Sequence, residues 1–245
     1  MENMKIKQRI FTLLAVTAIV AIAVEARCSD LTKVKQLHSE STQVVTPKTR
    51  SFGTLNAERT IIIDSTIRRG TLADGTALIN NLKKNQTYYV IIDTPGGSVD
   101  EGMAFIRTMQ TAKKLKNNKS VCIINGAAYS MGAIIASYCH QTYIDPILGS
   151  MMYHQVALGV RGQLIQITQL LAFVARQVKI IEIDLASQMG ITYDQYKKLT
   201  TYEYWLTSED AVKLGYVDGF ATNYIFTVPE EKVTLKRFFR SIRGE

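Results

Sequence analysis

The sequence predicts one α/β domain with a largely parallel sheet, and two observations support this expectation. Short runs of β-branched and aromatic residues alternate with segments of helical periodicity along most of the chain. Such alternation implies right-handed crossover helices between parallel strands. The chain has 245 residues and is 47% hydrophobic, which suits one well-buried domain and is short for two.

The predicted domain spans residues 57–222, and its elements follow in a regular order. Strands are expected at 60–64, 87–93, 120–125, 142–145 and 150–155, and helices at 73–84, 99–116 and 131–138. Residues 27–56 are polar and are expected to form a linker or arm. Residues 223–245 form a basic tail with interleaved phenylalanines, expected to be a solvated end or a contact to an anionic membrane.

A long helix is expected from Gln163 to Gln188, because this stretch contains neither glycine nor proline. At 1.5 Å per residue it would be roughly 39 Å long. Its leucine, isoleucine, valine and phenylalanine residues fall on more than one face, so the helix needs cover on most sides. We expect part of that cover to come from another subunit; the alternative is a central core helix.

The first 26 residues are typical of a signal peptide or an N-terminal membrane anchor. Lys5, Lys7 and Arg9 precede an uncharged, mostly apolar run of 15 residues, Ile10 to Val24. Small residues follow at the positions that a signal peptidase reads. Because a comfortable membrane span needs about 20 residues, cleavage is favoured over retention.

Charge and cysteine content narrow the function classes. The net charge of +8 favours acidic partners or membrane surfaces, or simply a solvated basic surface, and no nucleic-acid partner is predicted. Cys28, Cys122 and Cys139 are odd in number and widely spaced, which argues against a disulfide framework. With three histidines and no metal-binding motif, neither a metal nor a cofactor is expected.

Three strand-to-helix or strand-end segments carry candidate chemistry. Ser130 stands between a strand and a helix, where unpaired backbone N–H groups can hold a developing oxyanion; a helix cap is the commoner role of such a serine. A second segment, "DTPGGSVDEG" (93–102), exposes backbone N–H groups at the carboxyl end of a strand. It matches neither of the two glycine-rich phosphate-binding patterns, G-x-G-x-x-G and G-x-x-x-x-G-K-[ST]. His154 ends an apolar strand, and would serve as a base if it reached Ser130.

These pieces occur together in an order that resembles the Clp protease proteolytic subunit (ClpP) family. The motifs are "PGGSVDEGM", "TMQ", "GAAYSMGA", "MMYHQ", "GQ" at 162–163 and "WLTSEDAVKLGYVDGF" at 205–220. The likeness covers about residues 57–220, with a slightly longer segment near "KKLKNNK". It implies a ClpP/crotonase-like fold of repeated β-β-α units with a long protruding handle helix.

The resemblance implies a serine endopeptidase that acts through an acyl-enzyme. Ser130 looks like the nucleophile and His154 like its general base. The backbone N–H groups of Gly97 and Met131 look like the oxyanion hole. Each assignment follows from the position that the residue holds in the matched motifs.

The third member of the triad departs from the family pattern. The family's acid is usually an aspartate two residues before the aromatic residue matched here by Trp205, and this chain has Glu203. Glutamate serves in some Ser-His-acid hydrolases, but its extra methylene shifts the carboxylate. Asp194 and Asp210 are fallback candidates, and an exposed surface charge is the simpler interpretation of Glu203.

The resemblance also implies partners and a location. Substrates would be peptides or unfolded proteins, and the handle helix from Gln163 would stack rings of identical subunits. The family is usually cytosolic and fed by an ATP-driven unfoldase, whereas this chain has no nucleotide-binding loop. If the leader functions, the protein is exported or membrane-associated and would work without an ATPase; otherwise it is cytoplasmic.

Three alternatives stay open at this level. The first is a membrane-associated protease resembling signal peptide peptidase A, which uses a serine–lysine pair. The second is a crotonase-like acyl-CoA enzyme with similar oxyanion loops, which would not need Ser130. The third is a degenerate, non-catalytic ring subunit, suggested by Glu203.

Overall fold

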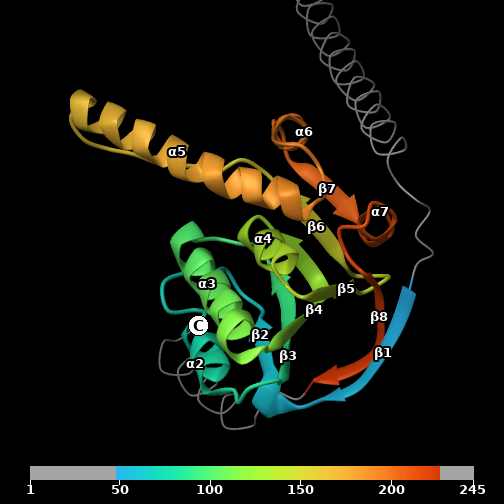
Figure 1. Cartoon of the computed structure of the whole chain (residues 1–245). Helices are drawn as coiled ribbons and strands as arrows, with labels where there is room; N and C mark the ends of the chain where they lie inside the picture. The colour runs from blue at the N-terminus through green and yellow to red at the C-terminus, as the bar shows by residue number, and fades with distance from the viewer. Residues whose placement is uncertain (1–47, 227–245) are drawn as a thin grey trace, which may run out of the picture. The chain divides into compact units, whose positions relative to one another are not determined.

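The computed structural model describes residues 48–226, which form a mixed α/β body around one eight-stranded sheet (Figure 1). The main strand order is β1-β8-β5-β4-β3-β2, and β6 pairs with both β4 and β7. Every pairing is parallel except that of β6 with β7. The predicted α/β class and largely parallel sheet are therefore confirmed.

The helices and strands follow the predicted alternation closely. The strands are β1 (Lys48–Leu55), β2 (Thr60–Ile63), β3 (Thr87–Thr94), β4 (Lys119–Tyr129), β5 (Gln141–Ile144), β6 (Ser150–Tyr153), β7 (Tyr204–Thr207) and β8 (Gly219–Phe226). The α-helices are α2 (Ala73–Asn81), α3 (Val99–Lys116), α4 (Met131–Ser137), α5 (Leu164–Gln188), α6 (Tyr193–Leu199) and α7 (Ser208–Lys213), and a 3-10 turn covers Ala57–Arg59.

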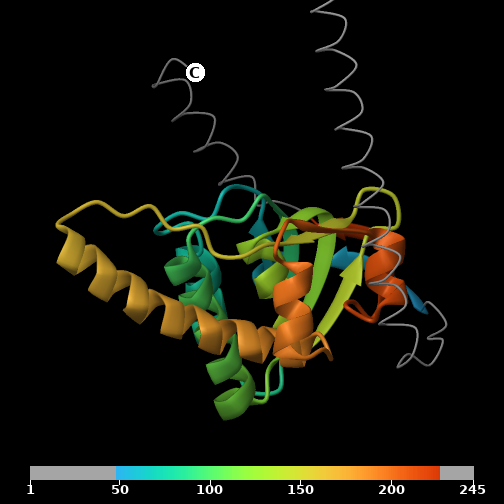
Figure 2. The same cartoon turned by 90° about the horizontal axis from the view of Figure 1, so that it is seen from above.

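The core lies around β3 and β4, whose central residues are buried on both faces of the sheet. Val90, Ile91 and Ile92 pair in register with Cys122, Ile123 and Ile124, and all six side chains are buried. Continuous apolar runs of this kind are typical of parallel strands that are covered on both sides. Helices α2, α3 and α4 lie together beside the sheet and supply the cover on one side (Figures 1 and 2).

Strand β4 changes partner along its length, and this change shapes the functional end of the sheet. Its first half pairs with β5, from Val121↔Gln141 to Ile124↔Ile144. Its last three residues pair with β6, ending at Tyr129↔Met152. Because β4 and β6 are parallel, the residues that follow the two strands emerge side by side.

Helix α5 extends away from the sheet, and only its C-terminal third packs on the rest of the domain (Figures 1 and 2). Its buried residues are Glu182, Leu185 and Ala186, whereas large apolar residues along the helix are exposed: Leu164, Ile165, Leu170, Leu171, Phe173, Ile180 and Ile183. The alternative of a central core helix is therefore wrong. Within residues 48–226, α5 is also long and apolar enough to cross a membrane, with a mean hydropathy of 1.4.

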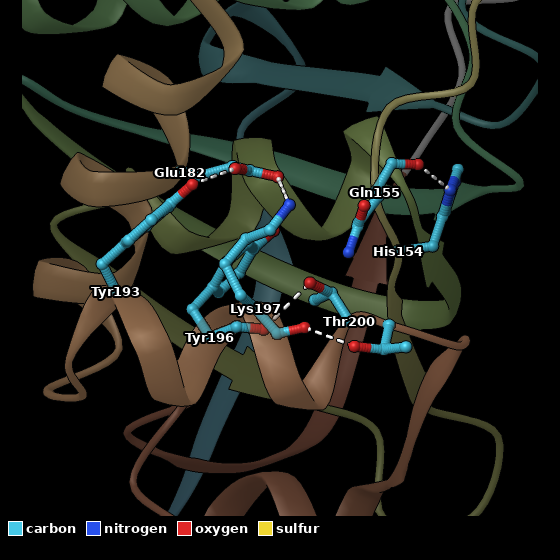
Figure 3. Close-up of polar contacts among 8 residues, drawn as sticks. His154, Gln155, Glu182, Tyr193, Tyr196, Lys197 and Thr200 are labelled. Atoms are coloured by element: carbon cyan, nitrogen blue, oxygen red, sulfur yellow. Dashed lines mark hydrogen bonds and ion pairs between the residues drawn. The ribbon is translucent and has the colours of Figure 1, made fainter. Parts of the chain in front are cut away.

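Helix α6 is fastened to the base of α5 by a buried carboxylate (Figure 3). Glu182 is 5% exposed, and its carboxylate lies 3.3 Å from Lys197 Nζ and accepts a hydrogen bond from Tyr193 Oη at 3.4 Å. Thr192 starts α6 with a capping box to Gln195. These contacts hold the turn between α5 and α6, which leads the chain back to β7.

The sheet extends beyond the predicted domain at both ends. An arm was expected up to residue 56 and a tail from residue 223, but Lys48–Leu55 pairs in parallel with Gly219–Phe226 as β1 and β8. Leu55 and Ala221 join the buried cluster with Val121 and Ile123, which explains why both segments are ordered as strands. The leader expected over residues 1–26 lies outside the described residues, as does most of the predicted tail.

The structure pairs Cys122 with Cys139 in a disulfide, which corrects the expectation drawn from cysteine spacing. Cys122 lies in β4, and Cys139 follows α4, which folds back over the sheet after Ser130. This return brings the two Cα atoms to 6.0 Å, within the range of a disulfide. Sequence spacing alone does not show that return.

Candidate active site

Three parallel strands end at one edge of the sheet, and each delivers one part of the candidate site. The Pro95–Gly97 loop follows β3, Ser130 follows β4, and His154 follows β6. Thr94 of β3 pairs with Ala128 of β4 after a register shift, and Tyr129 of β4 pairs with Met152 of β6. Ligand sites of parallel α/β sheets form at such carboxyl ends.

The structure brings Ser130 and His154 together. His154 Nε2 lies 2.8 Å from Ser130 Oγ, although 24 residues separate the two in sequence. The Ser130 backbone adopts φ 53° and ψ −118°, which is unusual for a residue with a side chain, and its N–H donates to Met152 O at 2.8 Å. The bond to β6 thus fixes a sharp turn that presents the serine hydroxyl to the histidine.

The second ring nitrogen of His154 contacts a main-chain carbonyl (Figure 3). His154 Nδ1 lies 2.6 Å from Gln155 O. A carbonyl oxygen can only accept a hydrogen bond, so Nδ1 carries the proton in the neutral ring. Nε2 is then the acceptor and Ser130 Oγ the donor, which is the arrangement that a general base requires.

Two backbone N–H groups beside the serine are available to an oxyanion. Neither the Gly97 nor the Met131 amide donates to another group of residues 48–226 in the hydrogen-bond network. Met131 N–H belongs to the first turn of α4, where backbone donors have no partner within the helix. Gly97 is exposed, so its amide can reach a bound molecule.

Gly96 packs the loop against the serine turn. A Cβ atom at this position would lie 2.5 Å from Tyr129 O, 2.7 Å from Ser130 Cβ and 3.0 Å from Met131 N. Gly96 also has φ +91°, which favours glycine. The loop is held in place by Ile67, whose N–H donates to Gly96 O and whose carbonyl accepts from Ser98 N–H. The loop that carries the Gly97 amide is therefore packed, through Gly96, against the nucleophile's own backbone.

The carboxylate of Glu203 does not accept a hydrogen bond from His154. Glu203 Oε2 accepts a hydrogen bond from Trp205 Nε1 at 3.0 Å, while the contact at His154 Nδ1 is the Gln155 carbonyl. Alternate residues of an extended segment point to the same face, so the side chains of Glu203 and Trp205, on either side of Tyr204, can form this hydrogen bond. The triad position expected for Glu203 is thus filled by a backbone oxygen.

The fallback carboxylates lie elsewhere. Asp210 Oδ2 accepts from Thr207 Oγ1 at 2.9 Å, and together these residues cap α7. Asp194 is exposed in the first turn of α6. Within the described part of the chain, neither makes a hydrogen bond with His154, and no group of three or more His, Cys, Asp or Glu residues is placed to hold a metal ion.

Sequence reasoning missed two groups at this site. The Gln155 carbonyl has no side-chain signature, so nothing in the residue pattern could have indicated it. Trp205 marks the position from which Glu203 is counted, and the two-residue spacing between them also places both side chains on one face of an extended segment. That spacing was a usable signal for their contact.

The comparisons with known proteins agree with this geometry. The family model for Clp protease matches residues 45–223, which is most of the chain and includes every part of the site described above. That match starts close to β1 and ends within β8, so it also covers the strand pair that lies beyond the predicted domain.

Curated relatives extend the same match across bacteria. An ATP-dependent Clp protease proteolytic subunit of Borrelia garinii subsp. bavariensis is 29% identical over 172 residues, covering 69% of this chain and 87% of the relative. A proteolytic subunit of Streptococcus gordonii is 31% identical over 139 residues, covering 55% and 68%. Proteolytic subunit 2 of Tropheryma whipplei is 30% identical over 148 residues, covering 59% and 79%.

The family model, these relatives and the meeting of the serine and histidine motifs at one sheet edge lead to the same assignment. The chain belongs to the Clp protease family of serine endopeptidases.

Proposed function

We propose that the chain hydrolyses peptide bonds in short peptides and unfolded proteins through an acyl-enzyme on Ser130. The observation that carries this proposal is the 2.8 Å contact between Ser130 Oγ and an acceptor nitrogen of His154. Serine is a weak nucleophile without a base, and this contact supplies one. The adjacent Gly97 and Met131 amides support acyl transfer, because both can donate to the oxygen that becomes negative.

The proposed chemistry proceeds in two halves. Ser130 Oγ attacks the scissile carbonyl carbon while its proton passes to His154 Nε2, and the carbonyl oxygen becomes an anion near the two amides. The C–N bond then breaks as the leaving nitrogen takes the proton from Nε2. Water repeats the sequence on the acyl-enzyme, giving its proton to His154 and restoring the Ser130 hydroxyl.

We propose further that the enzyme works as a ring of identical subunits. Helix α5 supports this, since its apolar residues stay exposed in the single chain and need cover. An enclosed set of sites would admit only short or unfolded chains, which matches the substrate class. The relatives above are named ATP-dependent subunits, whereas we propose that this chain degrades its substrates without an ATPase.

The location that we propose is an oxidising compartment outside the cytosol. The leader-like residues 1–26 motivate this, and the Cys122–Cys139 disulfide supports it, because such bonds persist mainly in oxidising environments. ATP is scarce there, so degradation without an ATPase is expected. Fractionation of cells with a tagged full chain tests this location, and recovery of the protein only in the cytosol would reject it.

Covalent labelling with a fluorophosphonate, followed by intact mass, tests the catalytic proposal. Wild type should gain one adduct, and Ser130→Ala should gain none. His154→Ala should slow labelling by at least about a thousandfold, since the base is lost. Peptide hydrolysis should fall in parallel with labelling in each variant.

His140→Ala is the matched control, because His140 is an exposed histidine just before β5. It should label as fast as wild type. An assembled wild type that takes no adduct would favour the non-catalytic ring subunit. The bond of Glu203 to Trp205 instead of His154 makes this a specific second candidate. Labelling that survives His154→Ala would favour a serine–lysine protease instead.

A further inference from the structure

Glu203 lies at the register position next to the candidate base, although its carboxylate points elsewhere. The antiparallel ladder of β6 and β7 ends at the pair Tyr153↔Tyr204. His154 and Glu203 are the residues that directly follow and precede this last pair, so the same register, continued by one residue, would set them opposite each other. Directly opposed residues of an antiparallel pair have Cβ atoms about 5 Å apart, so a rotation of the Glu203 side chain can span the remaining distance.

Trp205 holds the carboxylate away from the histidine. Its Nε1–H donates to Glu203 Oε2 at 3.0 Å, and its ring packs edge-on against Tyr129 with centroids 4.9 Å apart. The Tyr129 hydroxyl is itself hydrogen-bonded to Ser150 Oγ at 2.9 Å. The indole therefore has a fixed place on β4 and β6, and its N–H fixes Glu203 in turn.

The neutral histidine does not need the carboxylate. Its Nδ1–H already donates to Gln155 O at 2.6 Å, which sets the tautomer and the ring orientation. The preferred acceptor for Nδ1–H changes from the Gln155 carbonyl to the Glu203 carboxylate once the ring takes the proton of Ser130 and becomes positively charged. A hydrogen bond between an imidazolium and a carboxylate is much stronger than one to a neutral carbonyl. Half of the Trp205 surface (50%) is exposed, so water can replace the bond that Glu203 gives up.

We propose that Trp205 is a positioning residue that keeps Glu203 in reserve: the carboxylate stays on the indole while His154 is neutral and moves to Nδ1–H when the ring is charged. This inference rests on the proposed function. When Ser130 Oγ bonds to the carbonyl carbon, its proton sits on Nε2 and Glu203 stabilises the charge. When the leaving nitrogen takes that proton and the C–N bond breaks, the ring is neutral and Glu203 returns to Trp205.

Labelling kinetics test the restraint. Trp205→Phe keeps an aromatic ring against Tyr129 and removes the N–H, so the freed carboxylate should raise the fluorophosphonate labelling rate roughly three- to tenfold. Glu203→Gln should lower the rate by at least about tenfold, because the charged ring loses its partner. The gain in Trp205→Phe should vanish in the double variant Trp205→Phe/Glu203→Gln.

The fluorescence of Trp205 tests the movement independently of turnover. The chain contains one tryptophan, so its emission reports this indole alone. Emission should differ between wild type and Glu203→Ala, which has no side-chain acceptor for the indole N–H. It should also shift in wild type when Ser130 bonds to phosphorus, fluoride leaves and the proton goes to His154. Labelled and unlabelled Glu203→Ala should give the same spectrum. Glu209→Gln, which removes an exposed charge from α7, should behave as wild type.

Each result decides the proposal. Glu203→Gln that labels within twofold of wild type, or Trp205→Phe that labels no faster in the same assembly state, would overturn it. Identical emission from wild type and Glu203→Ala, which has no side-chain acceptor, would show that the indole is not held by Glu203. A folded wild type that takes no label would instead defeat the proposed function, while the emission of the unlabelled proteins would still report the contact.

Discussion

The disulfide between Cys122 and Cys139 closes a loop that contains Ser130 and the whole of helix α4. Cys122 is buried in β4, at the opposite end of the strand from the serine. The C-terminal end of α4 is tied a second time, since the Tyr138 hydroxyl donates a hydrogen bond to Asp184 of α5. The segment that carries the candidate nucleophile is therefore anchored at both of its ends.

Removal of this disulfide should destabilise the domain. For a sequence separation of 17 residues, the loop entropy predicts a loss of about 3 kcal/mol in the free energy of unfolding. Urea denaturation of Cys122→Ser/Cys139→Ser, at one protein concentration, measures the loss. Reductant should weaken wild type by the same amount and leave the double variant unchanged. Equal stability of wild type with and without reductant would contradict the prediction.

Gly96→Ala should separate the oxyanion loop from the serine. The added methyl group would meet Tyr129 O at 2.5 Å and Ser130 Cβ at 2.7 Å, so the loop must shift. A shift of about 1 Å in such a site costs roughly a hundredfold in rate, and the labelling rate should fall by that factor. The rate is measured with the fluorophosphonate probe on folded, assembled protein.

Gly70→Ala is the control for this substitution. Gly70 has φ +84°, close to the φ +91° of Gly96, but nothing lies within 4 Å of the added methyl group. Both variants carry the same kind of backbone strain, and only Gly96→Ala adds the collision. Equal labelling rates in the two variants would mean that the loop does not act through contact with Ser130.

The fold was largely predictable because its signals are local. Runs such as 87–93 and 120–125 are buried on both faces, and their composition alone indicates central strands. Strand β1 was missed because most of its residues face solvent and the segment reads as polar. Its pairing with β8 depends on a partner about 170 residues away, and no local pattern reports that contact.

The parts of the candidate site that belong to sequence motifs could be predicted. The motifs indicated which serine, histidine and loop belong together, and the sheet edge brings them into contact. The position of Glu203 also followed from counting along the chain. Its side-chain direction did not, since it depends on whether Trp205 or His154 offers the better donor. The disulfide was missed for a similar reason, because it depends on the path of α4 over the sheet.

Lys197→Ala should loosen the junction of α5 and α6. Glu182 is buried, so loss of its partner leaves an uncompensated charge. Because the Lys197 side chain is 35% exposed, we discount the full penalty and expect a loss of about 2 kcal/mol in the free energy of unfolding. Lys198→Ala, which removes the exposed neighbouring charge, should stay within about 0.5 kcal/mol of wild type. Equal losses of stability in Lys197→Ala and Lys198→Ala would show that the effect comes from the change in net charge and not from the contact with Glu182.

Alkaline pH should destabilise the domain through Tyr88. Burial raises the pKa of Tyr88 to about 12, with an opposing contribution from a hydrogen bond to Ser120. The folded state therefore retains this proton more strongly than the unfolded chain, where the group titrates near pH 10. Its contribution to stability is fully present below about pH 10 and is lost as the pH rises through about 12.

Tyr88→Phe should remove this part of the pH dependence. Between about pH 10 and 12, wild type should lose up to about 3 kcal/mol more stability than the variant, which has no group to ionise. Urea denaturation at several pH values measures the difference. Tyr202→Phe, at a position that is 70% exposed, should follow wild type. Parallel curves for Tyr88→Phe and wild type would exclude Tyr88 as the titrating group.

Phe173→Glu should disrupt assembly without unfolding the subunit. Phe173 is 53% exposed on the part of α5 that projects from the domain, so the substitution costs the single chain little. In the proposed assembly, where α5 is expected to stack one ring on another, the same side chain is covered, and burial of a phenylalanine contributes about 2 kcal/mol for each copy. The charged variant should therefore elute as smaller species in size exclusion with light scattering, with circular dichroism unchanged.

Gln177→Glu adds the same charge at an exposed polar position one turn further along α5, and it should assemble as wild type. If Phe173→Glu keeps the mass of wild type, another surface must hold the subunits together, because a buried carboxylate at this position could not be tolerated.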